Sequence, residues 1–247
     1  MRIYFSSDLH LHSTSHEQNE RFLGFLENIP KSGDTLVLGG DIFDLFVGDK
    51  KIFRKRFAKI LEAIRNVEKR ACSVYYLEGN HDFHLKRIFR RQERLFVMQD
   101  DFELKWGRKT FWICHGDQID KEDYGYRVLR YITRSIWFRS FLKSIPDGFV
   151  KYAGELSSKT SRKYNNIESL PMDRRERTKK LFRDYARGKI AEGYDFVFIG
   201  HSHQADQKQF QFSGRFGEYI NLGFSSDKIL YAEYCNESQK LNLKSYP

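Results

Sequence analysis

The sequence predicts an α/β fold with two β-sheets. Short apolar runs of strand length alternate with helical patterns over the first 114 residues, and this alternation is typical of α/β layering. After Ile199 the pattern changes to strands with short turns, which favours antiparallel hairpins in a second sheet packed on the first. Between the two regions, residues 118–192 show helical periodicity with few strand-like runs. They predict a helical insertion at the rim of the core.

The expected elements follow one another in a regular order. Five apolar runs predict buried strands because they are rich in β-branched and aromatic residues; they span residues 3–5, 35–38, 74–77, 110–114 and 196–199. Apolar side chains at three- and four-residue spacing predict helices at 17–29 and 51–69. Hairpin strands are expected at 207–212, 217–222, 229–234 and 240–244. We expect one domain, residues 1–247, that contains the 118–192 insertion, because the strand pattern resumes after it.

Composition limits the classes of protein that this chain can be. Its 247 residues are 40% hydrophobic and 31% charged, which is typical of a globular protein. No stretch approaches the roughly 20 apolar residues of a membrane span, and the N-terminus lacks the pattern of a signal peptide, so we expect a cytoplasmic protein. The three cysteines have no CxxC spacing and predict neither a disulfide framework nor a thiolate zinc site. The net charge of +10 favours anionic partners without choosing among nucleic acids, phosphorylated substrates and acidic membranes.

Each predicted buried strand is followed by a cluster of polar residues. The clusters are Asp8-Leu9-His10, Gly40-Asp41, Gly79-Asn80-His81-Asp82, His115-Gly116-Asp117 and Gly200-His201-Ser202-His203. In open α/β sheets ligands bind beyond the carboxyl ends of the strands, so these clusters should converge on one site. A glycine in four of the clusters allows the sharp turn that aims the next side chain at that site.

The residue types in these clusters indicate metal chemistry. Seven side chains are candidate ligands: Asp8, His10, Asp41, Asn80, His115, His201 and His203. Oxygen and imidazole donors without thiolate suit manganese, iron, zinc or cobalt. Seven donors are too many for one ion and enough for two ions that share a carboxylate. Because two ions about 3.5–4 Å apart clamp a phosphoryl group and activate a water molecule, the sequence predicts phosphoester hydrolysis.

Taken together, these motifs, with Asp44 three residues after Asp41, resemble the calcineurin-like metallophosphoesterase superfamily over nearly the whole chain. The resemblance implies a four-layer αββα sandwich with a helical cap. It assigns one metal to Asp8, His10, Asp41 and His203 and the other to Asp41, Asn80, His115 and His201, with Asp41 as the bridge. It also implies that His81 protonates the leaving oxygen or steadies the phosphoryl group, and that Asp82 orients His81.

Within the superfamily, residues 7–11, 40–49, 79–83 and 115–118 are similar to the UDP-2,3-diacylglucosamine diphosphatase family. That family cleaves the pyrophosphate of an acylated UDP-sugar in lipid A biosynthesis. The similarity implies two divalent ions, for which we expect Mn²⁺ with Fe, Zn or Co as alternatives, a cap over the acyl chains, and a peripheral position on the anionic inner face of the inner membrane. It assigns Asp123 and Tyr126 to the sugar side of the substrate, and Ser161, Arg162 and Asn165 to the sugar phosphate.

The sequence allows alternatives to this family branch and to this function. The best-known branch of that family has arginine at the position of His81, so the chain matches the wider superfamily or a sister branch there. A soluble phosphodiesterase or nuclease with the same metals is favoured by the charge of +10. A metal-free scaffold is a third hypothesis, against which the seven intact ligand positions argue. If the chain is a diphosphatase of this family, we expect no specific nucleic-acid binding. The sequence makes no prediction of the oligomeric state.

Overall fold

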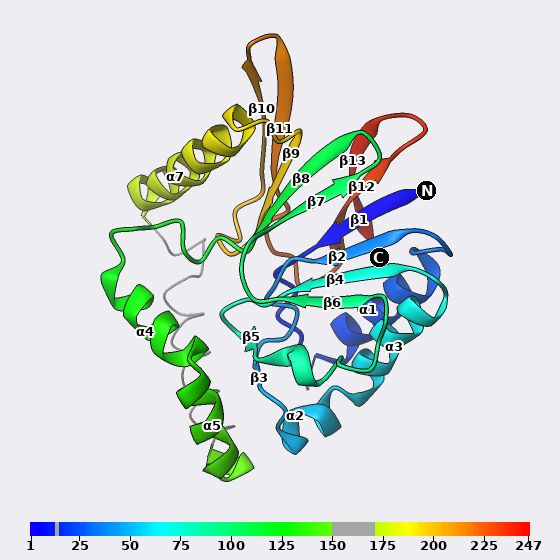
Figure 1. The fold of residues 1–247 in the computed structure, drawn as a ribbon, viewed down its shortest axis with the longest axis vertical. Coiled ribbons are helices and arrows are strands. Elements are labelled where there is room, and N and C mark those ends of the chain that lie inside the picture. The colour runs from blue at the N-terminus through cyan, green and yellow to red at the C-terminus, as the bar shows by residue number, and fades with distance from the viewer. Residues whose placement is uncertain (13–14, 150–170) are drawn as a thin grey trace.

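Two β-sheets pack face to face in the computed structural model, which describes residues 1–12, 15–149 and 171–247 (Figure 1). The first sheet has the strand order β13-β12-β1-β2-β4-β6. Its strands are β1 (Arg2–Ser6), β2 (Thr35–Leu38), β4 (Ser73–Leu77), β6 (Leu95–Met98), β12 (Ile229–Cys235) and β13 (Lys240–Tyr246). The second sheet has the order β10-β11-β9-β8-β7. Its strands are β7 (Phe102–Trp106), β8 (Lys109–Cys114), β9 (Phe196–Ile199), β10 (Asp206–Phe212) and β11 (Arg215–Asn221).

The strands that precede the polar clusters run parallel to their neighbours. In the first sheet β1, β2, β4 and β6 are mutually parallel and β12 is antiparallel to β1. In the second sheet β8, β9 and β11 are parallel. Parallel strands end at the same edge of a sheet, so the loops after β1, β2 and β4 lie together, as do those after β8 and β9.

Alternation along the strands explains the four layers. Ile3 and Phe5 of β1 lie in the core between the sheets with residues of β9, where the rings of Phe5 and Phe198 stack at 4.4 Å. Tyr4 points to the opposite face, which is covered by α1 (His16–Asn28) and α3 (Ala58–Lys69). Val197 and its neighbours pack on α7 (Met172–Ala191) beyond the second sheet. The prediction of a four-layer αββα fold is confirmed.

Three details of the predicted topology were wrong. The four C-terminal strands do not form one sheet, because β10 and β11 join the second sheet while β12 and β13 extend the first. The strands β6 and β7 were missed, since they are short edge strands with exposed residues in their pattern. The helix expected at 51–69 is divided at Phe57 into α2 (Lys51–Arg56) and α3.

The predicted 118–192 insertion contains three of the described helices. Two of them, α4 (Tyr124–Arg134) and α5 (Ile136–Ser144), extend away from the sheets on one side of the molecule (Figure 1). The third, α7, instead buries Phe182, Ala186 and Ile190 against the second sheet. Within the described ranges no helix combines the length and apolarity needed to cross a bilayer.

Candidate metal centre

The loops after five strands, drawn from both sheets, bring the seven candidate ligands together. Asp8 and His10 follow β1, Asp41 follows β2, Asn80 follows β4, His115 follows β8, and His201 and His203 follow β9. His10 Nε2 lies 2.9 Å from His203 Nε2. Asn80 Oδ1 lies 2.9 Å from His201 Nδ1 and 3.1 Å from His115 Nε2. Donors bound to one ion at about 2.1 Å are roughly 3 Å apart, so these separations fit a metal centre.

The donor atoms form two groups around Asp41. Asp8, His10 and His203 have donor atoms within 4.8 Å of one another, and so have Asp41, His115 and His201. Asp41 Oδ2 lies 3.8 Å from His10 Nε2 in the first group and 3.5 Å from His115 Nε2 in the second. One carboxylate oxygen therefore faces both groups, as a shared ligand must.

Five of the seven candidates have a left-handed backbone, which the sequence analysis did not anticipate. The φ angles are 54° at Asp8, 46° at His10, 53° at Asp41, 65° at His201 and 56° at His203. This conformation costs about 1–2 kcal/mol for a residue with a Cβ, although Asp, Asn and His adopt it more readily than others. Strain of this kind persists at functional sites because the surrounding structure imposes it.

Two of the four predicted glycine turns serve a different purpose. Gly40 and Gly116 have φ angles of 90° and 109°, as a sharp turn requires. Gly79 has no positive φ; it is glycine because a Cβ there would overlap the Asp41 carboxylate. Gly200 is likewise packed against the Asp8 carboxylate. Missing side chains at these two positions allow the ligand loops to approach each other.

Burial sets the protonation of most imidazoles in the centre. It lowers the pKa of His201 and of His203 to about 4 and that of His10 well below its ordinary value. A neutral imidazole has a lone pair to offer, and metal ligands must be deprotonated. These three rings therefore suit a divalent cation.

The two carboxylates differ in charge. Burial raises the pKa of Asp8 to about 7. Burial also acts to raise the pKa of Asp41, but the neighbouring His115 outweighs it and holds that pKa well below the ordinary value. Burial correspondingly opposes the charged form of His115, while Asp41 raises its pKa to about 10. The negative charge is concentrated on Asp41, where both groups of donors meet.

His81 lies beside these groups and is held by the loop after β2. His81 Nδ1 donates to the backbone carbonyl of Asp44 at 2.8 Å, because a carbonyl can only accept. The rings of His81 and His10 are 4.9 Å apart, and donor atoms of His10, Asp44 and His81 lie within 4.8 Å of one another. Asp44 was not predicted as a site residue, although its spacing from Asp41 was part of the motif.

Asp82, which was predicted to orient His81, bonds to the backbone of two neighbouring loops. Its carboxylate is fully buried, and it accepts from the backbone N–H groups of Asp41 at 3.0 Å and Ile42 at 2.7 Å. It also accepts from Gly79 N–H and from the Tyr76 hydroxyl. The structure thus gives the orientation of His81 to the Asp44 carbonyl, and Asp82 ties the loop of Asp41 to the loop of Asn80.

We expect Asp82→Asn to weaken metal binding by roughly 10- to 100-fold. This is the usual loss of metal affinity when a residue that supports a metal ligand by hydrogen bonds is replaced. An amide NH₂ cannot accept the hydrogen bonds that fix the Asp41 loop. Calorimetric titration of the chelator-treated protein with Mn²⁺ measures the change. Asp195→Asn is the matched control, because Asp195 accepts from Thr110 and Lys109 at the opposite end of β8. Equal weakening in both variants would contradict the role given to Asp82.

Of the predicted substrate residues, Tyr126 lies at the centre and Asp123 does not. The Tyr126 hydroxyl donates to Asp117 at 2.5 Å, and its ring is 6.3 Å from that of His201. Asp123 is exposed and caps α4 by accepting from the Tyr126 backbone N–H at 2.8 Å. The other three, Ser161, Arg162 and Asn165, lie outside the described residues.

Helix α4 brings two arginines to the site that the sequence analysis missed. Arg130 donates to buried Asp117 at 2.9 Å. Arg134 donates to Glu78 Oε2 at 2.6 Å and to the Gly79 carbonyl at 2.8 Å, directly before Asn80. In the sequence these residues match an ordinary basic helix face, so the pattern gave no signal. Phe224, whose ring lies 5.5 Å from that of His203, was also missed, because an exposed apolar residue outside a helix or strand belongs to no motif.

The chain is similar to several known proteins. A family model described as calcineurin-like phosphoesterase matches residues 1–205. A UDP-2,3-diacylglucosamine hydrolase of Chromohalobacter salexigens is 26% identical over 88% of this chain and 86% of its own. Another, from Psychromonas ingrahamii, is 22% identical over 100% and 98% of the two chains. The solved structure of an archaeal phosphodiesterase aligns over 99% of both chains with 15% identity and a TM-score of 0.46.

Proposed function

Because the chain belongs to the calcineurin-like phosphoesterase family and is a metal-dependent phosphoester hydrolase, we propose that it cleaves the pyrophosphate of UDP-2,3-diacylglucosamine. The products are UMP and 2,3-diacylglucosamine 1-phosphate, in the lipid A pathway. The relatives named for this substrate align over most of their length, which supports the choice of substrate.

The observation that carries the proposal is the position of Asp41 Oδ2 between the two groups of donors. Asp8, His10, Asp41 and His203 would hold one divalent ion, and Asp41, Asn80, His115 and His201 the other. When bound, two such ions supply Lewis-acid stabilisation to a phosphoryl group between them. Mn²⁺ suits these oxygen and imidazole donors, with Fe, Zn and Co as alternatives.

His81 is the residue proposed to act on the leaving group. With Nδ1 bonded to the Asp44 carbonyl, Nε2 is the ring atom at which the imidazole exchanges a proton with the substrate. A positioned histidine that protonates a leaving oxygen contributes about 10²- to 10⁴-fold to the rate. Asp82 contributes by fixing the loop of Asp41, as its hydrogen bonds indicate.

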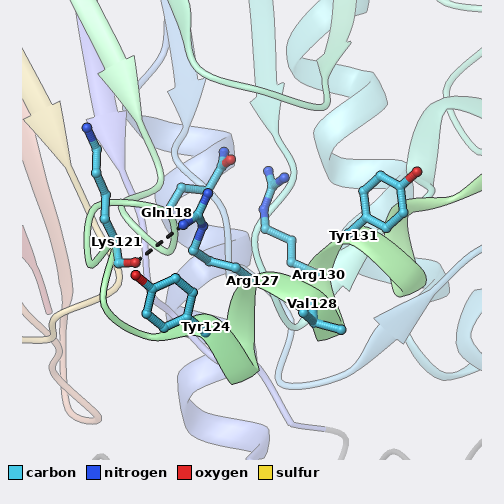
Figure 2. A pocket seen from close by; sticks show the side chains of 7 residues that line it. All are labelled: Gln118, Lys121, Tyr124, Arg127, Val128, Arg130 and Tyr131. Carbon is cyan, nitrogen blue, oxygen red and sulfur yellow. Dashed lines mark hydrogen bonds between the residues drawn. The ribbon is translucent and has the colours of Figure 1, made fainter.

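Residues 118–192 are proposed to supply the cap over the substrate, beside the metal centre. A pocket of about 550 Å³ lies along α4 and the loop before it. Figure 2 shows the side chains that line it, among them Tyr124, Val128 and Tyr131, with Arg127 bonded to the Lys121 carbonyl. This mixture of apolar and cationic side chains suits an acylated and phosphorylated sugar. Tyr126, on the same helix, is proposed to contact the sugar side.

The outer face of α4 and α5 is proposed to lie on an anionic membrane surface, which would be the inner face of the inner membrane. Five apolar side chains of these helices that do not line that pocket are exposed: Leu129, Ile132, Ile136, Trp137 and Phe141. Apolar helix faces of this kind enter the headgroup region of bilayers, where an acylated substrate resides, and the net charge of +10 favours an anionic surface.

We expect the purified, Mn²⁺-loaded protein to convert UDP-2,3-diacylglucosamine to UMP with a kcat/KM in the enzyme range of about 10⁴–10⁸ M⁻¹s⁻¹. Chromatographic detection of UMP measures the reaction, and the chelator-treated protein is the control. A preparation that left this substrate intact while it hydrolysed simple phosphodiesters would contradict the proposed substrate.

The alternative is a phosphodiesterase or nuclease that uses the same residues, and the charge of +10 is the observation that favours it. Hydrolysis of single-stranded DNA would mark it if the rate fell steeply with salt, because phosphate contacts release counterions. Assays of the same preparation with UDP-2,3-diacylglucosamine and with single-stranded DNA distinguish the two functions.

A further inference from the structure

A second cationic cavity lies between α5 and the core, apart from the metal centre. Its volume is about 320 Å³, within the range of small-molecule sites. We call it the α5 pocket and define it by Lys50, Lys51, His84, Arg87, Arg139 and Lys143. His84 follows the short strand β5 (Asp82–Phe83), three residues beyond His81. None of the lining residues is a candidate metal ligand, so the α5 pocket has walls of its own.

The positive charges of the α5 pocket are mostly uncompensated. The two acids that line it are engaged: Asp147 lies 3.5 Å from Lys50 Nζ, and Asp49 pairs with Arg54 at 3.0 Å. Among the described residues, Lys51, Arg87, Arg139 and Lys143 have no ion-pair partner. Four like charges around one cavity repel one another, and a bound anion would remove that repulsion.

One ring nitrogen of a buried histidine in the same pocket has no hydrogen-bond partner among the described residues. His84 is 5% exposed, and its Nε2 donates to the Thr133 carbonyl at 2.8 Å. Its buried Nδ1 has no hydrogen-bond partner among the described residues. Since Nε2 carries the hydrogen and burial lowers the pKa of His84, Nδ1 is an acceptor. The cavity that His84 lines with guanidinium and ammonium groups suits a phosphate anion, and hydrogen phosphate also carries a P–OH donor.

We propose that the α5 pocket binds a phosphate group that is separate from the one at the metal centre. Arg139 and Lys143 belong to α5, whereas Lys51 and Arg87 belong to the core. A phosphate held between them joins the helix pair α4–α5 to the core. The group is either free inorganic phosphate or a second phosphate of a substrate, because both present the same chemistry. The residues that would hold this phosphate all lie in the described ranges, and their charge is independent of the identity of the sugar nucleotide.

The test is calorimetric titration of the metal-loaded protein with inorganic phosphate. We expect two binding events, one at the metals and one in the α5 pocket. Arg87→Gln/Arg139→Gln should weaken the second event at least about tenfold, the usual worth of a charge-assisted hydrogen bond, and leave the first unchanged. Lys228→Gln/Lys240→Gln removes the same charge from exposed positions elsewhere and should retain both events. The variant Arg87→Lys/Arg139→Lys keeps both positive charges. If it retains the second binding event, the loss in Arg87→Gln/Arg139→Gln is due to charge and not to misfolding.

Soaking with tungstate, a phosphate analogue with a strong anomalous signal, locates the two sites directly. A peak between α5 and His84 supports the proposal, and a peak at the metals alone overturns it. The source follows from kinetics with the proposed UDP-sugar. A tenfold rise in KM at constant kcat in Arg87→Gln/Arg139→Gln assigns the pocket to the substrate. Unchanged kinetics with a lost phosphate event assign it to free phosphate. Phosphate binding that is identical in wild type and Arg87→Gln/Arg139→Gln refutes the pocket whatever the substrate proves to be.

Discussion

Asp41→Ala is expected to remove nearly all activity, with a loss of at least about a thousandfold. Its Oδ2 faces both groups of donors, at 3.8 Å from His10 and 3.5 Å from His115. With the two ions proposed above, losing a shared ligand would disturb both; their electrostatic stabilisation of the transition state would be worth several kcal/mol, and each 1.4 kcal/mol is about tenfold in rate. Metal analysis of the purified variant, together with its kcat, measures both effects.

His81→Ala is the matched comparison, since it removes a residue of the same centre that is proposed to act on the leaving group. This variant should retain its metal content and lose about 10²- to 10⁴-fold in kcat, the range for a proton donor. Equal metal loss in Asp41→Ala and His81→Ala would refute the division of roles, and would favour His81 as a ligand together with Asp44, whose donor atoms it approaches.

Arg134→Leu is expected to have the largest effect on stability, about 3 kcal/mol, which is the lower end of the cost of leaving a buried charge without its partner. Glu78 is buried, so burial raises its pKa, while Arg134 favours its charged form. For a chain of this size the loss lowers the melting temperature by roughly 6–12 °C. Thermal denaturation followed by circular dichroism measures it.

The control for this prediction is the double variant Arg134→Leu/Glu78→Gln. With both charges removed, the buried position holds a neutral amide whose oxygen can still accept from the Leu85 backbone N–H. We expect the double variant to melt above Arg134→Leu. A double variant that is no more stable than the single one would mean that the arginine acts through packing on Phe83 rather than through the charge of Glu78.

The sequence predicted the centre of the fold well because local pattern and function coincide there. Each buried strand has a short apolar run, and each is followed by polar residues that would be costly to bury without a shared partner. The seven candidate ligands could be found for that reason, and the structure brings their donor atoms together.

What the sequence could not predict depends on long-range pairing. Nothing in the strand 229–234 says whether it pairs with β11, its neighbour in the sequence, or with β1, because its apolar pattern fits either partner. The hydrogen bonds of Asp82 could not be predicted for a similar reason: proximity to His81 in the sequence suggested a pair, and nothing in the pattern indicates hydrogen bonds to a loop 40 residues away. Arg134 showed no signal, since a basic residue on a helix is normally solvated.

The left-handed backbone of the five ligand residues bears on how such a centre changes over evolutionary time. Only glycine, asparagine, aspartate and histidine fit that conformation readily, and all of these except glycine are also good metal donors. Selection for folding alone would therefore preserve many of the same residue types at these positions after catalysis had been lost. A descendant that had become a scaffold could keep an aspartate or an asparagine at position 8 or 41 for conformational reasons. Asn80 and His115 have no such backbone requirement. After a loss of metal binding, substitutions would therefore be expected first at these two positions.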